Sequence, residues 1–236
     1  MSHAVQTSWI DLAPGAFSGY LALPPLGRGP GLLLWQEIFG VNEHIRDVAQ
    51  QYALAGFVVL APDVFWRQTL RADLGYDGEA RPKAVALMQA CTAAPELLLA
   101  DIAQSVAALR ARPEVDGRVG SIGYCMGGRL SYLAAATAGV DAAVAYYGGG
   151  IQGQLTLAQR ITCPMQFHYA GHDDHIPPDA VQAVREAMAG KSAEFHVYPD
   201  AAHGFNCWAR ASYHAPSAAL AHGRSLSFLA RCLFAG

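Results

Sequence analysis

The chain has 236 residues, of which 53% are hydrophobic and 15% are charged, and its formal net charge at pH 7 is −3. That length and composition suit a single globular domain over residues 1–236 with a large core. A small negative charge excludes the basic surface with which proteins bind nucleic acid or an anionic membrane. No run approaches 18 uninterrupted apolar residues, and no basic segment precedes an apolar run near residue 1. We therefore expect neither a membrane-spanning helix nor a signal peptide.

Cysteine usage indicates a reducing compartment. The five cysteines are odd in number, are widely spread, and form no C-x-x-C pair. A disulfide framework and a cysteine zinc site both require paired cysteines, so we expect neither. We expect a cytoplasmic protein that needs no cofactor and exists as a monomer or a small homo-oligomer.

Strand patterns alternate with helix patterns along the chain. The run GLLLWQEI is continuously apolar before it turns polar, which is typical of a central strand in a parallel sheet. The next segment places Ile45, Val48 and Tyr52 at helical spacing. In chain order we expect strands over 8–12, 17–24 and 31–38, a helix over 41–56, a strand over 57–63, a helix over 95–110, a strand over 117–124, a helix over 126–139, strands over 142–148 and 163–171, a helix over 178–190, a strand over 193–200 and a helix over 213–234.

This alternation predicts an α/β fold with a mostly parallel central sheet and helices on both faces. Neither an internal repeat nor a linker interrupts the pattern. The Gly- and Asp-rich segment 72–83 is expected to be a mobile loop. It is either a lid or a plain surface connection.

The sequence GSIGYCMGG spans the junction between an expected strand and an expected helix. Its G-x-C-x-G pattern places Gly123 and Gly127 two residues before and after Cys125. A sharp, strained turn requires small residues at those positions and exposes its apex side chain at the carboxyl edge of the sheet. The positive end of the helix also favours a thiolate there. We interpret Cys125 as a nucleophile, with a buried structural cysteine as the alternative. The other four cysteines lack this context.

A nucleophile needs a base and an acid that orients the base. In one common arrangement these follow the nucleophile in the order acid, then histidine. The sequence AGHDDHIPP supplies Asp173 and Asp174 after one expected strand, and PDAAHGF supplies His203 after the next. Each lies just past the carboxyl end of a strand, at the same edge as Cys125.

The HDDH sequence at 172–175 also raises the question of a metal ion, because His and Asp are common metal ligands. Its run toward Pro177 and Pro178 is typical of a loop that carries an orienting acid. We therefore expect no metal. Histidines 196, 214 and 222 fall in a strand or at the last helix and are expected to be ordinary surface or core residues.

Six segments resemble the dienelactone hydrolase family (carboxymethylenebutenolidases), whose members have the α/β-hydrolase fold. They are WQEIFGVNEHIRDVA, FVVLAPDVF, VGSIGYCMGGRLSYLAA, AVAYYGGG, AGHDDHIPP and AAHGF. The combination of QEIFGVN with GYCMGG separates this family from ordinary serine esterases. The resemblance implies an esterase that opens an activated lactone or enol ester, a carboxymethylenebutenolide-like small molecule, in the degradation of aromatic compounds. It also implies an acyl-thioenzyme intermediate.

The resemblance implies a catalytic triad of Cys125, Asp173 and His203. Asp173 is preferred over Asp174 because the family's acid stands four residues before a proline, here Pro177. In this triad the histidine activates water for hydrolysis of the acyl-thioenzyme, and the acid orients the histidine.

The resemblance also implies roles for residues around the triad. The backbone N–H groups of Ile38 and Met126 would form the oxyanion hole. Glu37 matches the acid that exchanges partners with the cysteine and accepts its proton when substrate arrives. A carboxylate near an apolar strand end suits that role because burial favours its protonated form.

Family members bind the substrate carboxylate with two arginines. One follows the catalytic histidine by four residues, where this chain has Cys207 and places Arg210 three residues later. The other falls near EARPKAVA, where Arg81 and Lys83 are the candidates. Tyr147 matches a tyrosine of the family's pocket. Loss of a bidentate guanidinium would weaken the binding of a planar carboxylate.

Two alternatives stay open. A carboxylesterase or thioesterase of broader specificity would keep the scaffold but not the dienelactone pocket, and the cysteine at the arginine position supports it. A non-catalytic redox sensor would use Cys125 as an oxidisable thiol, although a sensor needs neither Asp173 nor His203.

Overall fold

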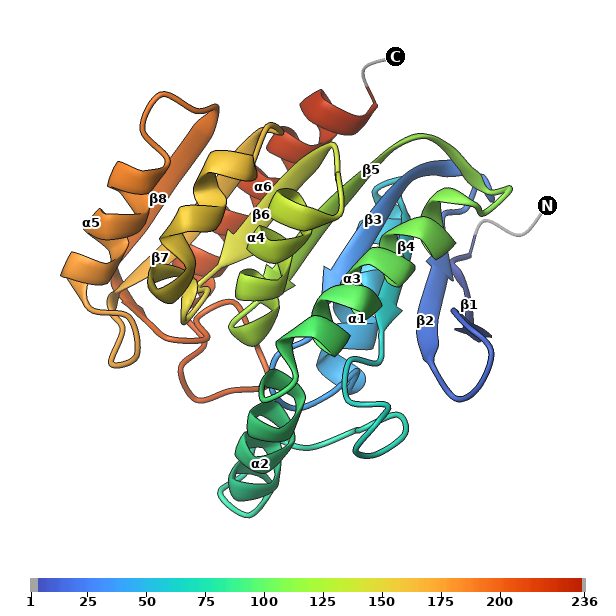
Figure 1. Cartoon of the computed structure of the whole chain (residues 1–236), viewed down its shortest axis with the longest axis horizontal. Coiled ribbons are helices and arrows are strands. Elements are labelled where there is room, and N and C mark those ends of the chain that lie inside the picture. Colours follow the sequence, from blue (N-terminus) through green and yellow to red (C-terminus); the bar gives the residue numbers. More distant parts are fainter. Residues whose placement is uncertain (1–3, 235–236) are drawn as a thin grey trace.

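An eight-stranded β-sheet runs through the centre of the protein, of which the computed structural model describes residues 4–234 (Figure 1). The strands are β1 (Gln6–Asp11), β2 (Ser18–Leu23), β3 (Gly29–Trp35), β4 (Val58–Pro62), β5 (Val115–Tyr124), β6 (Ala142–Tyr146), β7 (Met165–His172) and β8 (Ala193–Ala202). Their order in the sheet is β1-β2-β4-β3-β5-β6-β7-β8. Strands β1 and β2 pair antiparallel to their neighbours, whereas β3 to β8 pair in parallel. The predicted mostly parallel sheet is therefore confirmed.

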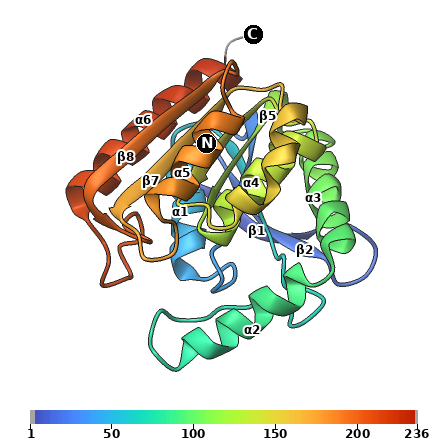
Figure 2. The same cartoon turned by 60° about the vertical axis from the view of Figure 1, so that its left-hand side comes forward.

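Helices cover both faces of the sheet, as the alternating pattern predicts. They are α1 (Glu43–Leu54), α2 (Ala80–Thr92), α3 (Pro95–Arg110), α4 (Met126–Thr137), α5 (Pro178–Ala187) and α6 (Ala215–Leu233), with a 3₁₀ helix η1 (Ile151–Arg160). In Figures 1 and 2, α3, α4 and α5 lie on one face and α1 and α6 on the other. Strands β3, β4 and β6 are buried along their whole length, which explains their continuous apolar runs.

Helix α2 stands outside both helical layers, beyond the carboxyl edge of the sheet (Figure 2). Over residues 4–234, no single helix is long and apolar enough to cross a membrane. Together α2 and α3 reach that length, but they are bent by 91° where they meet.

The segment 80–92 differs from the expectation of a loop over 72–83. The helix begins at Ala80, and its buried residues Ala84, Leu87 and Cys91 keep helical spacing. Two features of the sequence explain why this helix was not predicted. Only these three side chains are buried, so the apolar stripe is narrow. The first turn of the helix also contains Arg81 and Pro82, which are typical of a loop.

The turn between β5 and α4 is strained in the way its glycines predict. Cys125 has φ +56° and ψ −115°, a backbone conformation that non-glycine residues rarely adopt. A Cβ at Gly123 would overlap the carbonyl oxygen of Gly127, and a Cβ at Gly127 would overlap the carbonyl oxygen of Trp35. Only glycine at both positions lets the first turn of α4 approach the end of β3.

A buried chain of hydrogen bonds holds the same junction. The indole N–H of Trp35 donates to the Ser121 hydroxyl at 2.8 Å, and that hydroxyl donates to Ser131 at 2.9 Å. These residues come from β3, β5 and α4 respectively. Because all three are fully buried, the bonds fix the two strands and the helix relative to one another.

Gly123→Ala should lower the free energy of unfolding by about 2 kcal/mol or more, because a methyl group cannot enter this junction without a backbone shift. Gly223→Ala is the control. It lies exposed in α6 with open space around it, and it should raise stability by about 0.5–1 kcal/mol. Urea unfolding monitored by circular dichroism measures both. Equal stability of Gly123→Ala and the parent chain would contradict the packing argument.

Candidate active site

Three side chains from three different strand ends form a hydrogen-bonded row. Nε2 of His203 lies 3.1 Å from Sγ of Cys125. Nδ1 of the same ring lies 2.9 Å and 3.1 Å from the two carboxylate oxygens of Asp173. The residues that the sequence singled out as nucleophile, base and acid are therefore brought together, although they are up to 78 positions apart in the chain.

The pairing of β7 with β8 sets the spacing between the acid and the base. An irregularity after Ala170 shifts the register of these strands, so that His172 pairs with Ala202 and the next residues of the two strands are Asp173 and His203. Gly171 makes this close approach possible, because a Cβ there would overlap the backbone of Pro199.

Asp173 is held in place by its own loop. Its Oδ1 accepts hydrogen bonds from the backbone N–H groups of His175 at 2.9 Å and Ile176 at 3.1 Å. Its side chain is only 1% exposed. The neighbouring Asp174 is exposed to solvent, which explains why one of two adjacent aspartates orients the ring and the other does not.

The environment of His203 favours its protonated form. Burial lowers its pKa, but hydrogen bonds to Asp173 and to Cys125, together with the charges of both partners, outweigh burial and raise the pKa to about 10. The imidazolium is therefore the stable form of this ring at neutral pH. An imidazolium can donate a proton at Nε2 but cannot accept one.

A cavity of about 370 Å³ opens over the sulfur of Cys125. Its walls are formed by Ile38, Phe39, Arg81, Val85, Met88, Cys125, Met126, Arg129, Gly149, Gly150, His175, His203 and Arg210. Because α2 contributes three of these side chains, the helix forms one wall of the pocket. Whether the segment 72–83 acts as a lid stays open.

Glu37 lies beside the pocket in an ion pair. Its Oε1 accepts a hydrogen bond from Arg210 Nη1 at 3.0 Å, and its Oε2 accepts one from the Tyr76 hydroxyl at 2.9 Å. The side chain of Glu37 is 1% exposed, and that of Arg210 is 15% exposed. In this arrangement the hydrogen-bond partner of Cys125 is His203, and Glu37 is held by Arg210 and Tyr76.

Arg210 reaches the pocket although it stands three residues beyond the position that the family pattern gives. Two consecutive turns compact this loop, with hydrogen bonds from Cys207 N to Gly204 O and from Arg210 N to Cys207 O. Gly204 leaves space for the side chain of Arg210, because a Cβ at position 204 would overlap the guanidinium. An arginine of this loop therefore lines the cavity although position 207 is a cysteine.

The residues of the two expected oxyanion donors line the same cavity as Cys125. Met126 is the first residue of α4, so its N–H has no partner within the helix. Ile38 follows the end of β3, and both residues line the cavity.

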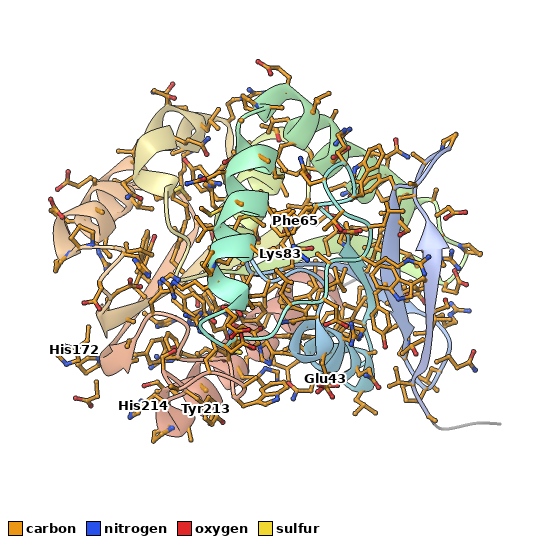
Figure 3. The ribbon with its side chains drawn as sticks, turned by 90° about the horizontal axis from the view of Figure 1, so that it is seen from below. Glu43, Phe65, Lys83, His172, Tyr213 and His214 are labelled. Atoms are coloured by element: carbon orange, nitrogen blue, oxygen red, sulfur yellow. The ribbon has the colours of Figure 1, made fainter. Side chains whose placement is uncertain are left out.

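The remaining substrate-binding candidates separate into those inside and those outside the pocket. Arg81 lines the cavity from α2. Lys83 is exposed on the same helix and lies outside the cavity wall (Figure 3). Tyr147 is fully buried and also lies outside the wall, so its ring contacts His203 at 5.1 Å between centroids rather than an incoming substrate. Neither Lys83 nor Tyr147 is therefore among the residues that line the cavity.

The HDDH segment does not converge on one point. His172 is exposed at the periphery in Figure 3, whereas the ring of His175 turns inward to 4.8 Å from that of His203. Within residues 4–234, no three His, Cys, Asp or Glu side chains gather in a way that could hold a metal ion.

Comparison with known proteins adds to this geometry. Residues 17–233 match the dienelactone hydrolase family. The chain belongs to that family. The carboxymethylenebutenolidase of Pseudomonas putida is 34% identical over 216 residues, which cover 91% of each chain. That of Pseudomonas sp. strain P51 is 34% identical over 218 residues, covering 92% of this chain and 91% of the relative.

Solved structures agree. A Klebsiella pneumoniae protein provisionally assigned as a dienelactone hydrolase superposes with a TM-score of 0.80 at 31% identity, covering 96% of this chain and 99% of that one. The dienelactone hydrolase of Anabaena variabilis shares the fold with a TM-score of 0.71, covering 98% of this chain and 100% of that one. This dienelactone hydrolase family member is accordingly a hydrolase of ester or lactone bonds in small molecules.

Three pocket features escaped sequence reasoning. Tyr76 lies in the segment expected to be a loop, and His175 was considered only as part of a possible metal site. Arg129 carries a signal that could have found it, since it stands four residues after Cys125, on the same face of α4.

The His203 ring of the folded enzyme should stay protonated until the pH approaches about 10. Because this pKa lies above the ordinary value of 6.5, the interaction stabilises the fold fully below pH 6.5 and is lost as the pH rises through about 10. Asp173→Asn should lower the pKa. Nitrogen-15 NMR of the ring measures this, with His222, whose pKa burial lowers, as the control. An unchanged His203 titration in Asp173→Asn would refute the assignment.

Proposed function

We propose that this enzyme hydrolyses an activated lactone or enol ester through an acyl-thioenzyme on Cys125. The observation that carries the proposal is the 3.1 Å separation between Sγ of Cys125 and Nε2 of His203, at a strained turn that opens into the cavity. A thiol nucleophile suits substrates whose leaving group is stable as an anion. Conjugated lactones and enol esters, which release an enolate, are such substrates. A poor leaving group, such as an amine, would need strong protonation before it could depart.

The acylation step follows from the positions of the reacting groups. The Cys125 thiolate attacks the carbonyl carbon, and the C–O bond to the leaving oxygen breaks as the S–C bond forms. The N–H groups of Met126 and Ile38 are placed to stabilise the oxyanion, a contribution of about 3 kcal/mol per donor in comparable sites. The His203 imidazolium is within reach to protonate the leaving oxygen.

Deacylation uses the ring in its neutral form. Having given its proton to the leaving group, His203 accepts a proton from water while Asp173 holds Nδ1. The resulting hydroxide attacks the thioester carbonyl, the acid leaves, and the sulfur departs as a thiolate beside the re-formed imidazolium. The row of three side chains thereby serves both steps.

The thiol needs a proton acceptor before acylation, and an already protonated His203 cannot serve. Glu37 takes this role in the proposal. A substrate carboxylate that binds Arg210 would compete with Glu37 for the guanidinium and release it from the ion pair. The freed carboxylate then accepts the thiol proton, so the nucleophile forms only when an anionic substrate is present. Arg81, on the opposite wall, is the second group placed to hold such a substrate.

The broader carboxylesterase is the weaker candidate. In the sequence this candidate was supported by Cys207, which stands where the family pattern has an arginine. Arg210 lines the pocket and can supply a guanidinium there, which weakens that support. A redox sensor has no use for a buried, oriented His203 and Asp173.

Cys125→Ala should lower kcat/KM on an activated lactone or aryl ester by a factor of about 10⁴ or more, because no other nucleophile faces the pocket wall. Cys232→Ala, at a half-buried cysteine near the end of α6, is the control and should retain full activity. Mass spectrometry after brief iodoacetamide treatment should find Cys125 modified first. Full turnover in Cys125→Ala would refute the proposal.

Glu37→Gln should slow acylation about a hundredfold and leave deacylation nearly unchanged, because the amide cannot accept the thiol proton. Stopped-flow kinetics with an anionic aryl ester separates the two steps through its burst and steady-state phases. Tyr76→Phe is the matched control, since it removes a hydrogen bond to Glu37 but keeps the carboxylate. Equal slowing of both steps in Glu37→Gln would rule out the proton-acceptor role.

A further inference from the structure

Arg129 occupies a position in the active site that the proposed mechanism leaves unused. It stands one helical turn after Cys125 on α4, and its backbone N–H lies 3.4 Å from the carbonyl oxygen of Cys125. Residues four apart share one face of a helix, so its side chain rises beside the nucleophile. It lines the cavity and is close enough to Cys125 for their charges to interact.

The guanidinium of Arg129 is half-buried and has no counter-charge. Within the described part of the chain, residues 4–234, no carboxylate forms an ion pair with it and no acceptor hydrogen-bonds its side chain. Its Nε is buried without a partner. A guanidinium stays charged under these conditions, so burial leaves an uncompensated positive charge, which is costly unless a ligand supplies an anion.

The surrounding backbone leaves space for this side chain. Gly150 has φ +90°, and a Cβ there would lie 3.0 Å from Nη1 of Arg129. The glycine therefore lets the guanidinium lie against the chain that follows β6. Gly149 and Gly150 both line the cavity, so the space next to the guanidinium belongs to the pocket.

The charges of the pocket point the same way. Arg81, Arg129 and Arg210 line it, and no aspartate or glutamate lines it among the residues that the structure describes. Glu37 neutralises Arg210 from behind the wall. The free enzyme therefore presents more positive charge than one substrate carboxylate would balance.

We propose that Arg129 forms a second anion subsite and that the substrate is a dianion, with one carboxylate at Arg210 and another at Arg129. This inference rests on the proposed hydrolysis at Cys125, because both subsites flank that sulfur. A planar carboxylate suits the paired N–H groups of a guanidinium, and their hydrogen bonds are charge-assisted. The class of substrate is thus an ester or lactone that carries two carboxylates.

Competitive inhibition tests the subsite. Hydrolysis of an aryl ester that carries one carboxylate reports on Cys125, and the competitors are succinate, glutarate and adipate against butyrate, valerate and caproate. The best dicarboxylate should bind at least about tenfold more tightly than its monocarboxylate partner, as one additional charge-assisted contact requires. In Arg129→Met this advantage should fall to about twofold or less.

Two further variants make the result specific. Arg129→Lys keeps the charge but loses the paired donors, so it should retain part of the advantage and also serves if Arg129→Met fails to fold. Lys83→Met removes a positive charge from the exposed side of α2, outside the pocket, and should leave the advantage unchanged. An undiminished advantage in Arg129→Met, no advantage in the parent enzyme, or tighter competition by inorganic phosphate than by any dicarboxylate would overturn the proposal.

A failure of the proposed function is distinguishable from a failure of the subsite. If the parent enzyme hydrolyses no ester, the rate at which iodoacetamide modifies Cys125, with and without the same dicarboxylates, replaces turnover as the readout. A change in that rate that depends on Arg129 would then support the subsite while the hydrolytic role falls. A change that Arg129→Met leaves unaltered would refute the subsite alone.

Discussion

The active site depends on one steric constraint, the near contact of three backbone segments where β5 turns into α4. The start of α4 lies so close to the ends of β3 and β5 that neither Gly123 nor Gly127 has room for a Cβ. This closeness forces Cys125 into its positive φ, and Ile38 and Met126 line the same cavity as its sulfur. The proposed nucleophile and the proposed oxyanion donors therefore belong to one packed junction.

The other half of the site is built independently, from the parallel pair β7 and β8. Their register delivers Asp173 and His203 side by side, and β6 is the strand that separates them from the elbow. Tyr146, on β6, contacts both halves of the site. Its carbonyl accepts a hydrogen bond from Cys125 N, and its ring stacks on His168 of β7. The sulfur–imidazole distance is thus fixed by strand spacing, which is a rigid property of the sheet.

The sequence predicted best what short-range physics determines. The elbow, the alternating elements and the order of Cys125, Asp173 and His203 all follow from spacing along the chain, and the parallel topology brings them together. The sequence could not show that Lys83 and Tyr147 lie outside the cavity wall, because which face of α2 meets the pocket, and which strand-end tyrosine is buried, depend on packing between distant segments. Arg210 could not be placed either, since two turns in its loop decide where its guanidinium lies. Single-domain organisation, cytoplasmic location and oligomeric state stay predictions.

The charges around the sulfur show how one pocket can keep a thiol inert and still use it. Asp173 holds a positive charge on His203, and Glu37 is occupied by Arg210, so the free site has no available base beside Cys125. An anion that enters the pocket would change this balance, because it would compete with Glu37 for Arg210 and would pair with the guanidinium of Arg129, which has no carboxylate partner in the described residues. In the proposed mechanism, substrate charge decides when Glu37 is free to accept the thiol proton. Selectivity for an anionic substrate and activation of the nucleophile would then be two effects of the same exchange of ion-pair partners.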